Sequence, residues 1–504
     1  MMKRIGKTSA FLMALTLVLA STGCAALGLR SAEETEAEAE TEEETAASVP
    51  FEENAETERK TFEEIIAAYE NNNAVSADEN AEPDPAADGA WASADDIGSA
   101  DASVPDASDP DPVSAAALST LMQNTAAVTA EYSTYAYGNL TDTELFTERD
   151  LAQNADLSEA SAVVLSDNNT IKINKEGVYV LSGTASECTV LVDVDKEEKV
   201  QLVLAGVNVT NSSFPAIYVL SADKVFVTTA QGTENSLSVT GSFVGDTENG
   251  VNTDAVIFSK EDLVLNGLGS LTVLSAAGNG ITTKDDLKIT GGTWTITSAL
   301  DSLEANDSIA ACGGTFAITT NKDGLHCENS DDDTLGWIWI GGGTWTVAAK
   351  SDGIQGTTFV QIDDGTLSIN ASEGIEGTYV QINGGTIGIY ASDDGINASR
   401  KSRAYSTPMI EINGGDLTVE VGPGDTDGID SNGDITVNGG TIRVTASMSS
   451  FDFDGSAVYN GGTIIVNGEQ VDGIPQSMMG GGFGGWGGGW GFGGFGGGGR
   501  GGRG

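Results

Sequence analysis

Short runs of alternating apolar and polar residues recur along the second half of the chain, separated by glycine-rich turns. Each repeat holds an apolar pair, a Gly-Gly-Thr or close variant, a second apolar pair, and then Asp-Gly-Ile or its equivalent. Five successive repeats occupy residues 286–305, 308–327, 337–356, 359–377 and 379–398. The alternation indicates β-strands, because an amphipathic helix would show a period of about 3.6 residues.

The spacing of these repeats predicts the fold class. The Thr of the Gly-Gly-Thr motif, or the residue in its place, stands at 293, 315, 344, 366, 386, 416, 441 and 463, and the commonest step is 22 residues. A repeat of this length built from short strands indicates a solenoid, in which each coil buries its apolar face against its neighbours. We therefore expect an all-β parallel β-helix with ~22-residue coils.

Alternation within the strands also assigns side chains to faces. Residues one and three positions after the Thr should point inward, which places Trp294 and Trp345 in the core. The preceding strand gives an outward row, here called the aromatic row: Trp337, Trp339, Phe359, Gln361, Tyr379 and Gln381. Exposed rings repeated every ~4.8 Å and flanked by amides would suit an extended glycan. The alternative is that neighbouring loops cover this row and turn it into a satellite core.

Each repeat also carries an acidic residue at its third strand, at Asp301, Asp323, Asp352, Glu373, Asp394 and Asp427. A single Asp-Gly favours a turn, because the carboxylate accepts backbone N–H groups and glycine tolerates positive φ. Carboxylates repeated on successive coils repel one another unless they are hydrogen-bonded, protonated or bridged by cations. Ca²⁺ is the expected cation, because it takes oxygen ligands from carboxylates, carbonyls and water.

Two acidic runs are the predicted calcium ligands. The first run is Asp425, Asp427, Asp430 and Asp434, and the second is Asp352, Glu373, Glu376 and Asp394. The chain has one histidine, His326, which is expected to be a structural residue with satisfied hydrogen bonds rather than a ligand.

Composition narrows the function. The net charge of −52 argues against nucleic acid as a partner, because phosphates demand Lys and Arg. Three loops, at about 328–336, 399–407 and 422–433, interrupt the repeats, and such insertions often lie on a binding face. The basic residues Arg400, Lys401 and Arg403 in the second loop are candidates for an ionic clamp on uronates.

The regions around the repeats differ in composition. Residues 1–23 have the charged start and apolar core of an export signal, and Cys24 follows small residues, as in a bacterial lipoprotein. The alternative is ordinary signal-peptidase cleavage nearby, and in both cases the protein is exported. Residues 24–130 form an acidic low-complexity linker and residues 478–504 a Gly-rich tail with aromatic residues, and both are expected to be disordered. The folded part is expected at 131–477, held at the outer face of a bacterial cell by the lipid on Cys24 alone.

The chain resembles a known family in several motifs. These are IKINKEGVYVLSGT (171–184), KVQLVLAGVNVTNSSFPAIYV (199–219), the INGGT and DGI repeats, and DTDGIDSNGD (425–434). They look like the clostridial carbohydrate-binding family that binds cellulose and polygalacturonate and is structurally akin to pectate lyases. The resemblance implies a right-handed parallel β-helix, calcium sites and a binding role, with cellulose or polygalacturonate as the partner.

Two other functions stay open. A calcium-dependent pectate lyase would need a Lys or Arg to abstract the proton next to the uronate carboxylate, and Lys322, Lys350 or the basic insertion could supply it. No basic residue recurs beside the densest acidic run, so no catalytic residue is assigned. A surface adhesin or stalk would bind no soluble glycan. A monomer is expected in each case.

Overall fold

The structure is a computed structural model that describes residues 140–141, 145–424 and 426–475. In these ranges the chain has one short helix, α4 (Glu148–Leu151), and otherwise strands and connections. The first strands are β1 (Ser161–Val164), β2 (Asn169–Ile173), β3 (Gly177–Ser186), β4 (Cys188–Asp193), β5 (Lys199–Asn211), β6 (Ile217–Ser221), β7 (Lys224–Thr229), β8 (Glu234–Val239), β9 (Ala255–Ser259), β10 (Asp262–Gly267) and β11 (Ser270–Ser275). The middle strands are β12 (Asn279–Thr283), β13 (Asp286–Ile289), β14 (Thr293–Ser298), β15 (Leu303–Ala305), β16 (Ser308–Ala311), β17 (Thr315–Thr320), β18 (Leu325–Cys327), β19 (Trp337–Ala348), β20 (Asp352–Ala371), β21 (Glu373–Ile382) and β22 (Thr386–Ala391). The last strands are β23 (Ile396–Ala398), β24 (Met409–Ile412), β25 (Asp416–Val421), β26 (Asp427–Ser431), β27 (Asp434–Val437), β28 (Thr441–Thr445), β29 (Ser449–Phe453), β30 (Ala457–Tyr459), β31 (Thr463–Val466) and β32 (Glu469–Val471).

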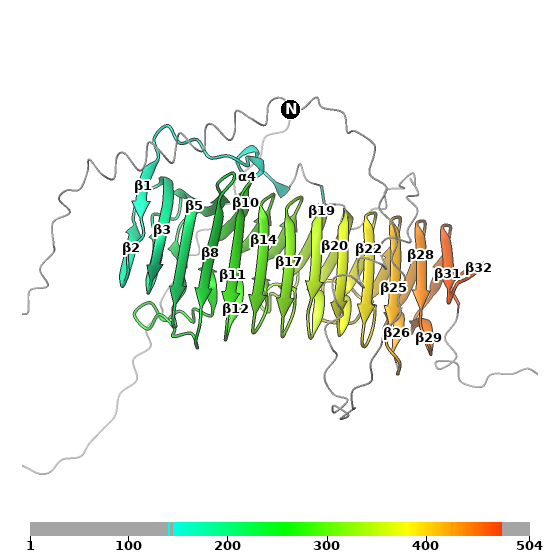
Figure 1. Cartoon of the computed structure of the whole chain (residues 1–504). Coiled ribbons are helices and arrows are strands. Elements are labelled where there is room, and N and C mark those ends of the chain that lie inside the picture. Colours follow the sequence, from blue (N-terminus) through cyan, green and yellow to red (C-terminus); the bar gives the residue numbers. More distant parts are fainter. Residues whose placement is uncertain (1–139, 142–144, 425, 476–504) are drawn as a thin grey trace, which may run out of the picture. The chain divides into compact units, whose positions relative to one another are not determined.

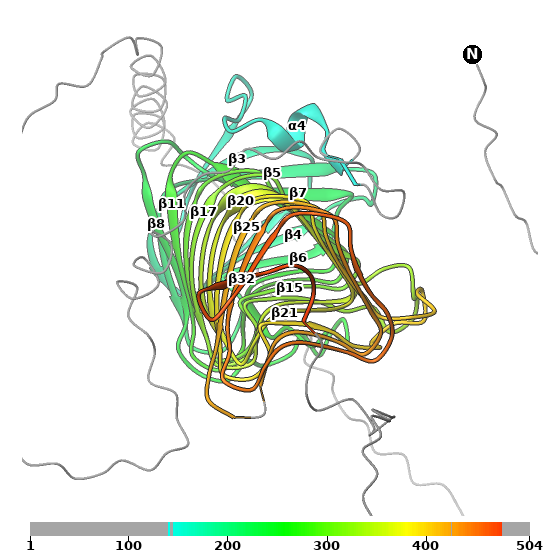
Figure 2. The ribbon, with the colours of Figure 1, turned by 90° about the vertical axis from the view of Figure 1, so that its right-hand side faces the viewer.

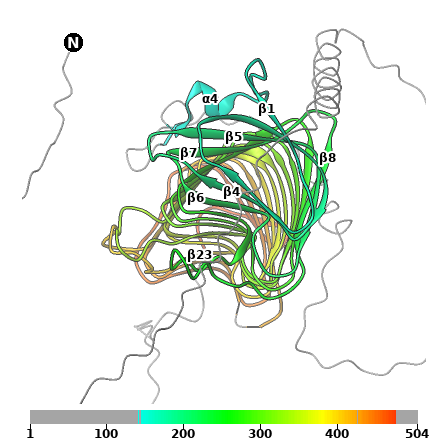
Figure 3. The ribbon, with the colours of Figure 1, turned by 90° about the vertical axis from the view of Figure 1, so that its left-hand side faces the viewer.

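Parallel pairing relates each strand to one that follows it a full circuit of the chain later. In the middle of the chain β10 pairs with β13, β11 with β14 and β12 with β15, and the same order continues through β16, β17 and β18. Figure 1 shows the strands side by side, and Figures 2 and 3 look along the stack. The last pair, β31 with β32, is antiparallel.

The core runs through the centre of this stack and is built from the inward columns of the repeats. Trp294, Phe316 and Trp345 stack on one another, with ring centroids 6.0 and 4.2 Å apart. All three are fully buried, which confirms the prediction that the tryptophans belong to the core. Ile and Val fill the adjacent columns on every circuit, because flat β-branched layers pack well at strand spacing.

The structure corrects the predicted fold class. The all-β composition and the parallel pairing agree with the prediction. The predicted right-handed solenoid of ~22-residue coils is wrong. All strands belong to one 32-stranded sheet that closes around the core (Figure 2). Long strands such as β5, β19 and β20 each pair with two rows of neighbouring strands, and they thereby join those rows into one sheet. Paired residues are separated by 18 positions at Ser161–Tyr179 and by 40 at Ile217–Ile257. The number of residues per circuit varies because strand pairing fixes the register of the strands, whereas the connections between strands can differ in length.

The Gly-Gly-Thr motif forms one corner of every repeat. Its second glycine has positive φ, for example +87° at Gly292 and +92° at Gly343, which a side chain would strain. Beside this corner, the amides of Asn383, Asn413, Asn438 and Asn460 hydrogen-bond to one another in sequence, each at 2.7 Å. The repeated turn residues therefore satisfy polar groups that would otherwise be unpaired at the corners.

A segment ahead of the first strand, here called the strap (residues 140–141 and 145–153), lies across the outside of the sheet. Thr147 caps α4 in a capping box with Asp150. The carboxylate of Asp150 is fully buried between Lys224, at 3.5 Å, and Lys288, at 3.9 Å. Gln153 donates to Thr290 O and accepts from Gly267 N, so the strap is fixed to the sheet by charge and by hydrogen bonds.

The predicted signal peptide (1–23), Cys24, the acidic linker (24–130) and the tail (478–504) lie outside the described residues. No helix within the described ranges has the length and apolar character needed to cross a bilayer.

Candidate functional site

The acidic residues of the repeats form two adjacent rows, here together called the acidic ladder. The turn row begins the third strand of each repeat and contains Asp301, Asp323, Asp352, Glu373, Asp394 and Asp427. The strand row lies three positions later and contains Glu304, His326, Gln355, Glu376, Asn397, Asp430 and Asp452. Successive members of the strand row are direct partners in the parallel sheet, so about 4.8 Å separates one rung from the next.

One oxygen of several turn-row carboxylates has a structural role. Asp301 Oδ1 accepts the backbone N–H of Asp323 at 3.0 Å, and Asp323 Oδ1 accepts that of Asp352 at 2.9 Å. Asp394 Oδ1 accepts the N–H of Asp427 at 2.9 Å. The carboxylates therefore accept backbone N–H groups as predicted, but from the next circuit. The predicted Asp-Gly turn with positive φ is wrong, because Gly324, Gly353 and Gly395 do not have positive φ. The second oxygen of Asp301 is also engaged, because Lys322 Nζ lies 2.7 Å from Oδ2.

Three carboxylates of the second predicted calcium run converge. Asp352, Glu373 and Glu376 each offer an oxygen within 4.8 Å of the others. Gln355 Nε2 donates to both Asp352 and Glu376 and so holds those two together. Asn397 Nδ2 donates to Glu373 at 3.0 Å, while its Oδ1 is buried and accepts no hydrogen bond. Four oxygen-bearing side chains therefore meet at this point, here called the carboxylate cluster (Asp352, Glu373, Glu376, Asn397).

The insertion at 399–407 reaches the same cluster. Lys401 Nζ lies 2.6 Å from Glu376 Oε2, and Ser399 Oγ donates to Glu376 Oε1 at 2.9 Å. The lysine offsets one negative charge of the cluster and leaves the others uncompensated.

Burial and neighbouring carboxylates disfavour the ionised form of several acidic residues in the ladder. Burial raises the pKa of Asp352 to about 8, and the neighbouring charges of Asp323, Glu376 and Glu373 add to the effect. Burial, together with Glu376, likewise raises the pKa of Glu373 to about 7. A cation placed among these oxygens would reverse the effect, because it favours the charged form of every carboxylate that it touches.

The first predicted calcium run is not brought together in the same way. Asp425 lies outside the described residues, while Asp427 and Asp430 occupy neighbouring rows of one rung. Burial raises the pKa of Asp430 to about 7, with Asp394 and Asp427 adding to it. Asp434 stands on β27 and accepts hydrogen bonds from Ser456 N and Oγ at 2.7 and 2.8 Å. Asp394 of the second run likewise stays outside the carboxylate cluster.

Sequence reasoning missed two further acidic groupings. Asp301 and Asp323 meet His326, but Lys322 Nζ already lies 2.7 Å from Asp301 Oδ2 and supplies the positive charge there. Asp262, Asp285 and Asp286 converge at another corner of the sheet. The doublet at 285–286 was visible in the sequence, whereas its pairing with Asp262 depends on the register of β10 and β13.

The aromatic row is covered, which corrects the prediction that it faces solvent. Trp339 is 3% exposed and Tyr379 1% exposed, and Gln361 and Gln381 are equally buried. The strap covers the first part: Phe146 packs on Trp339 at 5.9 Å, and Leu140 exchanges two hydrogen bonds with Gln361.

The rest of the aromatic row is covered by an insertion or by its own members. Tyr405 packs edge-on against Tyr379 at 5.2 Å. Trp337 and Phe359 stay half-buried and stack on each other at 5.6 Å. The alternative of a satellite core is therefore confirmed for most of this row.

The basic insertion has a more specific geometry than an open clamp. Arg400 donates to the backbone carbonyls of Tyr405 and Ser406 within its own loop, whereas Lys401 turns back to the carboxylate cluster. Arg403 is exposed, and its backbone N–H donates to Asp333 of the preceding insertion. The insertions at 328–336 and 399–407 therefore touch and form one rim beside the acidic ladder.

Comparisons with known proteins identify the family. The sequence model of the family described as "Carbohydrate-binding domain-containing protein" matches residues 167–426, just over half of the chain. A protein of that description from Acetivibrio thermocellus is 44% identical over 200 residues, which cover 40% of this chain and 70% of the relative. The chain belongs to the family of carbohydrate-binding domain-containing proteins, and this confirms the resemblance seen in its motifs.

One solved structure is also similar. It is a gadolinium derivative of a polysaccharide lyase-like protein from C. thermocellum, 33% identical in sequence with a TM-score of 0.38, and the match covers 45% of this chain and 93% of that one.

Proposed function

We propose that this protein binds polysaccharide along the acidic ladder, with Ca²⁺ held by the carboxylate cluster, and that its ligand is a polyuronate such as polygalacturonate. Export and attachment to the cell surface through Cys24 belong to the same proposal. The observation that carries it is the convergence of Asp352, Glu373 and Glu376 beside a buried, unpaired amide oxygen of Asn397.

The chemistry of the cluster suits calcium. Ca²⁺ takes six to eight oxygen ligands from carboxylates, amide or backbone carbonyls and water. The cluster offers three carboxylates, which leaves coordination positions open to solvent or ligand. Occupation by Ca²⁺ would explain why costly charges are retained at Asp352 and Glu373.

A polyuronate fits this surface better than cellulose does. A neutral glucan would need aromatic platforms, and most of the aromatic row is buried. A uronate carboxylate can complete the coordination of a bound Ca²⁺, which lets a negatively charged face accept a negatively charged glycan. The rim beside the cluster also presents the exposed side chain of Arg403 for an ion pair.

The geometry does not favour a lyase. Lys401 is the basic side chain at the cluster, and burial alone would lower its pKa. The hydrogen bond and charge of Glu376 outweigh that effect and raise the pKa of Lys401 above its ordinary value. An ammonium group held in its charged form is a poor general base at neutral pH.

The test is binding of the full chain to polygalacturonate and to cellulose, in calcium and in chelator, with ultraviolet absorbance recorded for unsaturated product. We expect polygalacturonate to bind only in calcium, without product. Glu373→Gln should weaken binding by about tenfold or more, because it removes a charged ligand. Glu234→Gln changes an exposed carboxylate on β8, away from the ladder, and should leave binding unchanged.

Equal binding in chelator would remove calcium from the proposal, and equal binding by Glu373→Gln would remove the carboxylate cluster. Release of unsaturated product would replace the binding role with a lyase. Absence of binding to either polymer would favour a surface stalk.

A further inference from the structure

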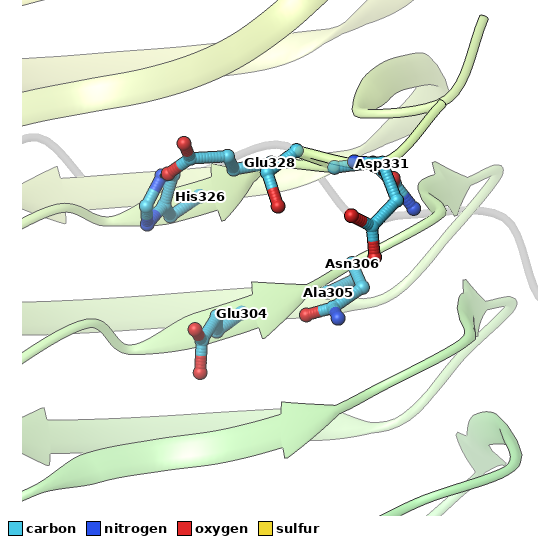
Figure 4. A pocket seen from close by; sticks show the side chains of 8 residues that line it. Glu304, Ala305, Asn306, His326, Glu328 and Asp331 are labelled. Atoms are coloured by element: carbon cyan, nitrogen blue, oxygen red, sulfur yellow. Dashed lines mark hydrogen bonds and ion pairs between the residues drawn. The ribbon is translucent and has the colours of Figure 1, made fainter. Parts of the chain in front are cut away.

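A cavity of about 220 Å³ opens at His326, one circuit before the carboxylate cluster. It is lined by Glu304, Asn306, His326, Glu328, Asn329 and Asp331, among others. His326 on β18 and Glu304 on β15 are direct partners in the sheet, and Glu328 follows His326 as the chain enters the insertion at 328–336. Figure 4 shows His326 and Glu304 on neighbouring strands, with Glu328 above them and Asp331 across the cavity.

The imidazole ring of His326 is held at one nitrogen and free of hydrogen bonds at the other. Nδ1 lies 3.3 Å from Asp301 Oδ2, and because a carboxylate accepts, Nδ1 carries the hydrogen. In the neutral ring the lone pair then resides on Nε2. Nε2 is buried and makes no hydrogen bond, and the residue is 8% exposed. The chain therefore buries a nitrogen ligand atom at the wall of a cavity without a hydrogen bond, which is a costly arrangement for a purely structural histidine.

This corrects the expectation that His326 has all its hydrogen bonds satisfied. A carboxylate that fixes the distant nitrogen of a histidine is the usual support for a metal-binding histidine, because it sets the tautomer and the direction of the free lone pair. Asp301 itself is already paired with Lys322 at 2.7 Å, so the Nε2 side is the side left for a ligand.

Glu328 supplies a carboxylate beside Nε2. Glu328 Oε2 lies 3.5 Å from it, close enough to share one ion after a small rotation of an exposed side chain. Glu304 Oε2 accepts from Asn279 and Thr282, and its Oε1 lies 3.6 Å from Lys284 Nζ, so Glu304 forms part of the cavity wall and is not counted as a ligand. Asn329 donates to Asp307 at 2.7 Å and accepts the N–H groups of Asp331 and Asp332, so the start of the insertion is ordered over the cavity.

We propose that this cavity is a binding site for a divalent transition-metal ion, with Zn²⁺ as the probe, held by His326 Nε2 and the carboxylate of Glu328, with room in the cavity for water ligands. A nitrogen with a carboxylate suits zinc and its neighbours in the periodic table, whereas Ca²⁺ takes oxygen ligands. The site is separate from the carboxylate cluster and does not depend on the proposed polysaccharide function.

The single histidine makes the test direct. In the full chain, prepared without a histidine tag, every histidine ring signal in an NMR spectrum comes from His326. We expect Zn²⁺, added in the presence of excess Ca²⁺, to shift the ¹⁵N resonance of Nε2 while Nδ1 stays protonated. Calcium alone should leave that resonance in place.

Two variants and a control measure the affinity by titration calorimetry. His326→Asn keeps an amide donor for Asp301 but removes Nε2, and it should weaken Zn²⁺ binding by at least about tenfold. Glu328→Gln should weaken it several-fold, and Glu234→Gln should not change it. The proposal would be overturned if Zn²⁺ left the Nε2 resonance in place, or if Ca²⁺ shifted it equally. It would also be overturned if His326→Asn bound Zn²⁺ with unchanged affinity. If His326→Asn fails to fold, the wild-type spectrum still decides.

Discussion

The aromatic row and the acidic ladder are two outward-facing rows of the same repeat, yet different kinds of groups contact them. Both recur once per circuit of the chain, and both follow from strand alternation. The strap and Tyr405 cover the aromatic row, whereas the ladder keeps its carboxylates. Covering rings gains about 25 cal/mol per Å² of apolar surface, while covering unpaired carboxylates is costly. The additional segments therefore cover the aromatic row with rings and apolar groups, whereas the insertion that reaches the ladder meets it with the polar groups of Lys401 and Ser399.

The largest test of this contrast is Trp339→Ala. Trp339 packs against Phe146 and donates from Nε1 to Asp363 at 2.8 Å. Its loss should lower the free energy of unfolding by about 3–5 kcal/mol, as measured by chemical denaturation. Trp339→Phe, which keeps most of the packing, should cost much less. A Trp339→Ala protein of unchanged stability would show that the row is a surface after all.

The strap can be loosened at its buried charge. Asp150→Ala removes the carboxylate that lies between Lys224 and Lys288, although Lys224 keeps Asp262 at 3.5 Å. Removal of one partner of a buried pair costs about 3–5 kcal/mol. Because the strap is peripheral, we expect the free energy of unfolding to fall by about 3 kcal/mol or less. We also expect iodide to quench tryptophan fluorescence more strongly than in the wild type. Unchanged quenching would mean that the strap does not depend on this carboxylate.

The ladder should make stability depend on pH. The pKa values of Asp352, Glu373 and Asp430 are raised to about 8, 7 and 7, so the folded state binds more protons than the unfolded state above pH ~4. Stability should therefore be highest near pH 4 to 5 and fall as pH rises towards 8. In chelator we expect the melting temperature to drop by several degrees over this range.

Calcium should remove most of that loss, because it stabilises the ionised carboxylates. Glu373→Gln should flatten the pH dependence and reduce the response to calcium. A melting temperature that rises between pH 5 and pH 8 in chelator would contradict the raised pKa values.

The smallest expected effect is that of Trp337→Ala. Trp337 is half-buried and stacks on Phe359 at the edge of the strap, so its loss should cost about 1–2 kcal/mol. Its removal should leave affinity for polygalacturonate unchanged, measured with the wild type in parallel. Weaker binding would return this edge of the aromatic row to the site.

The sequence by itself determined which residues face the core in each repeat and which acidic residues lie side by side on successive repeats. Alternation placed Trp294 and Trp345 in the core, and the spacing of the Asp-Gly motifs put Asp352 and Glu373 on neighbouring rungs. These properties follow from the strands themselves, because side chains alternate between the two faces of a strand over a few adjacent residues.

The tertiary structure decided what lies over each row and how the rows close into one sheet. The strap comes from residues about two hundred positions before the rings that it covers, and Tyr405 comes from an insertion with no repeat pattern. The free nitrogen of His326 depends on Asp301 from the preceding circuit. Strand parity tells which side of a sheet a residue faces, but only long-range packing decides whether that side is water, protein or a cavity.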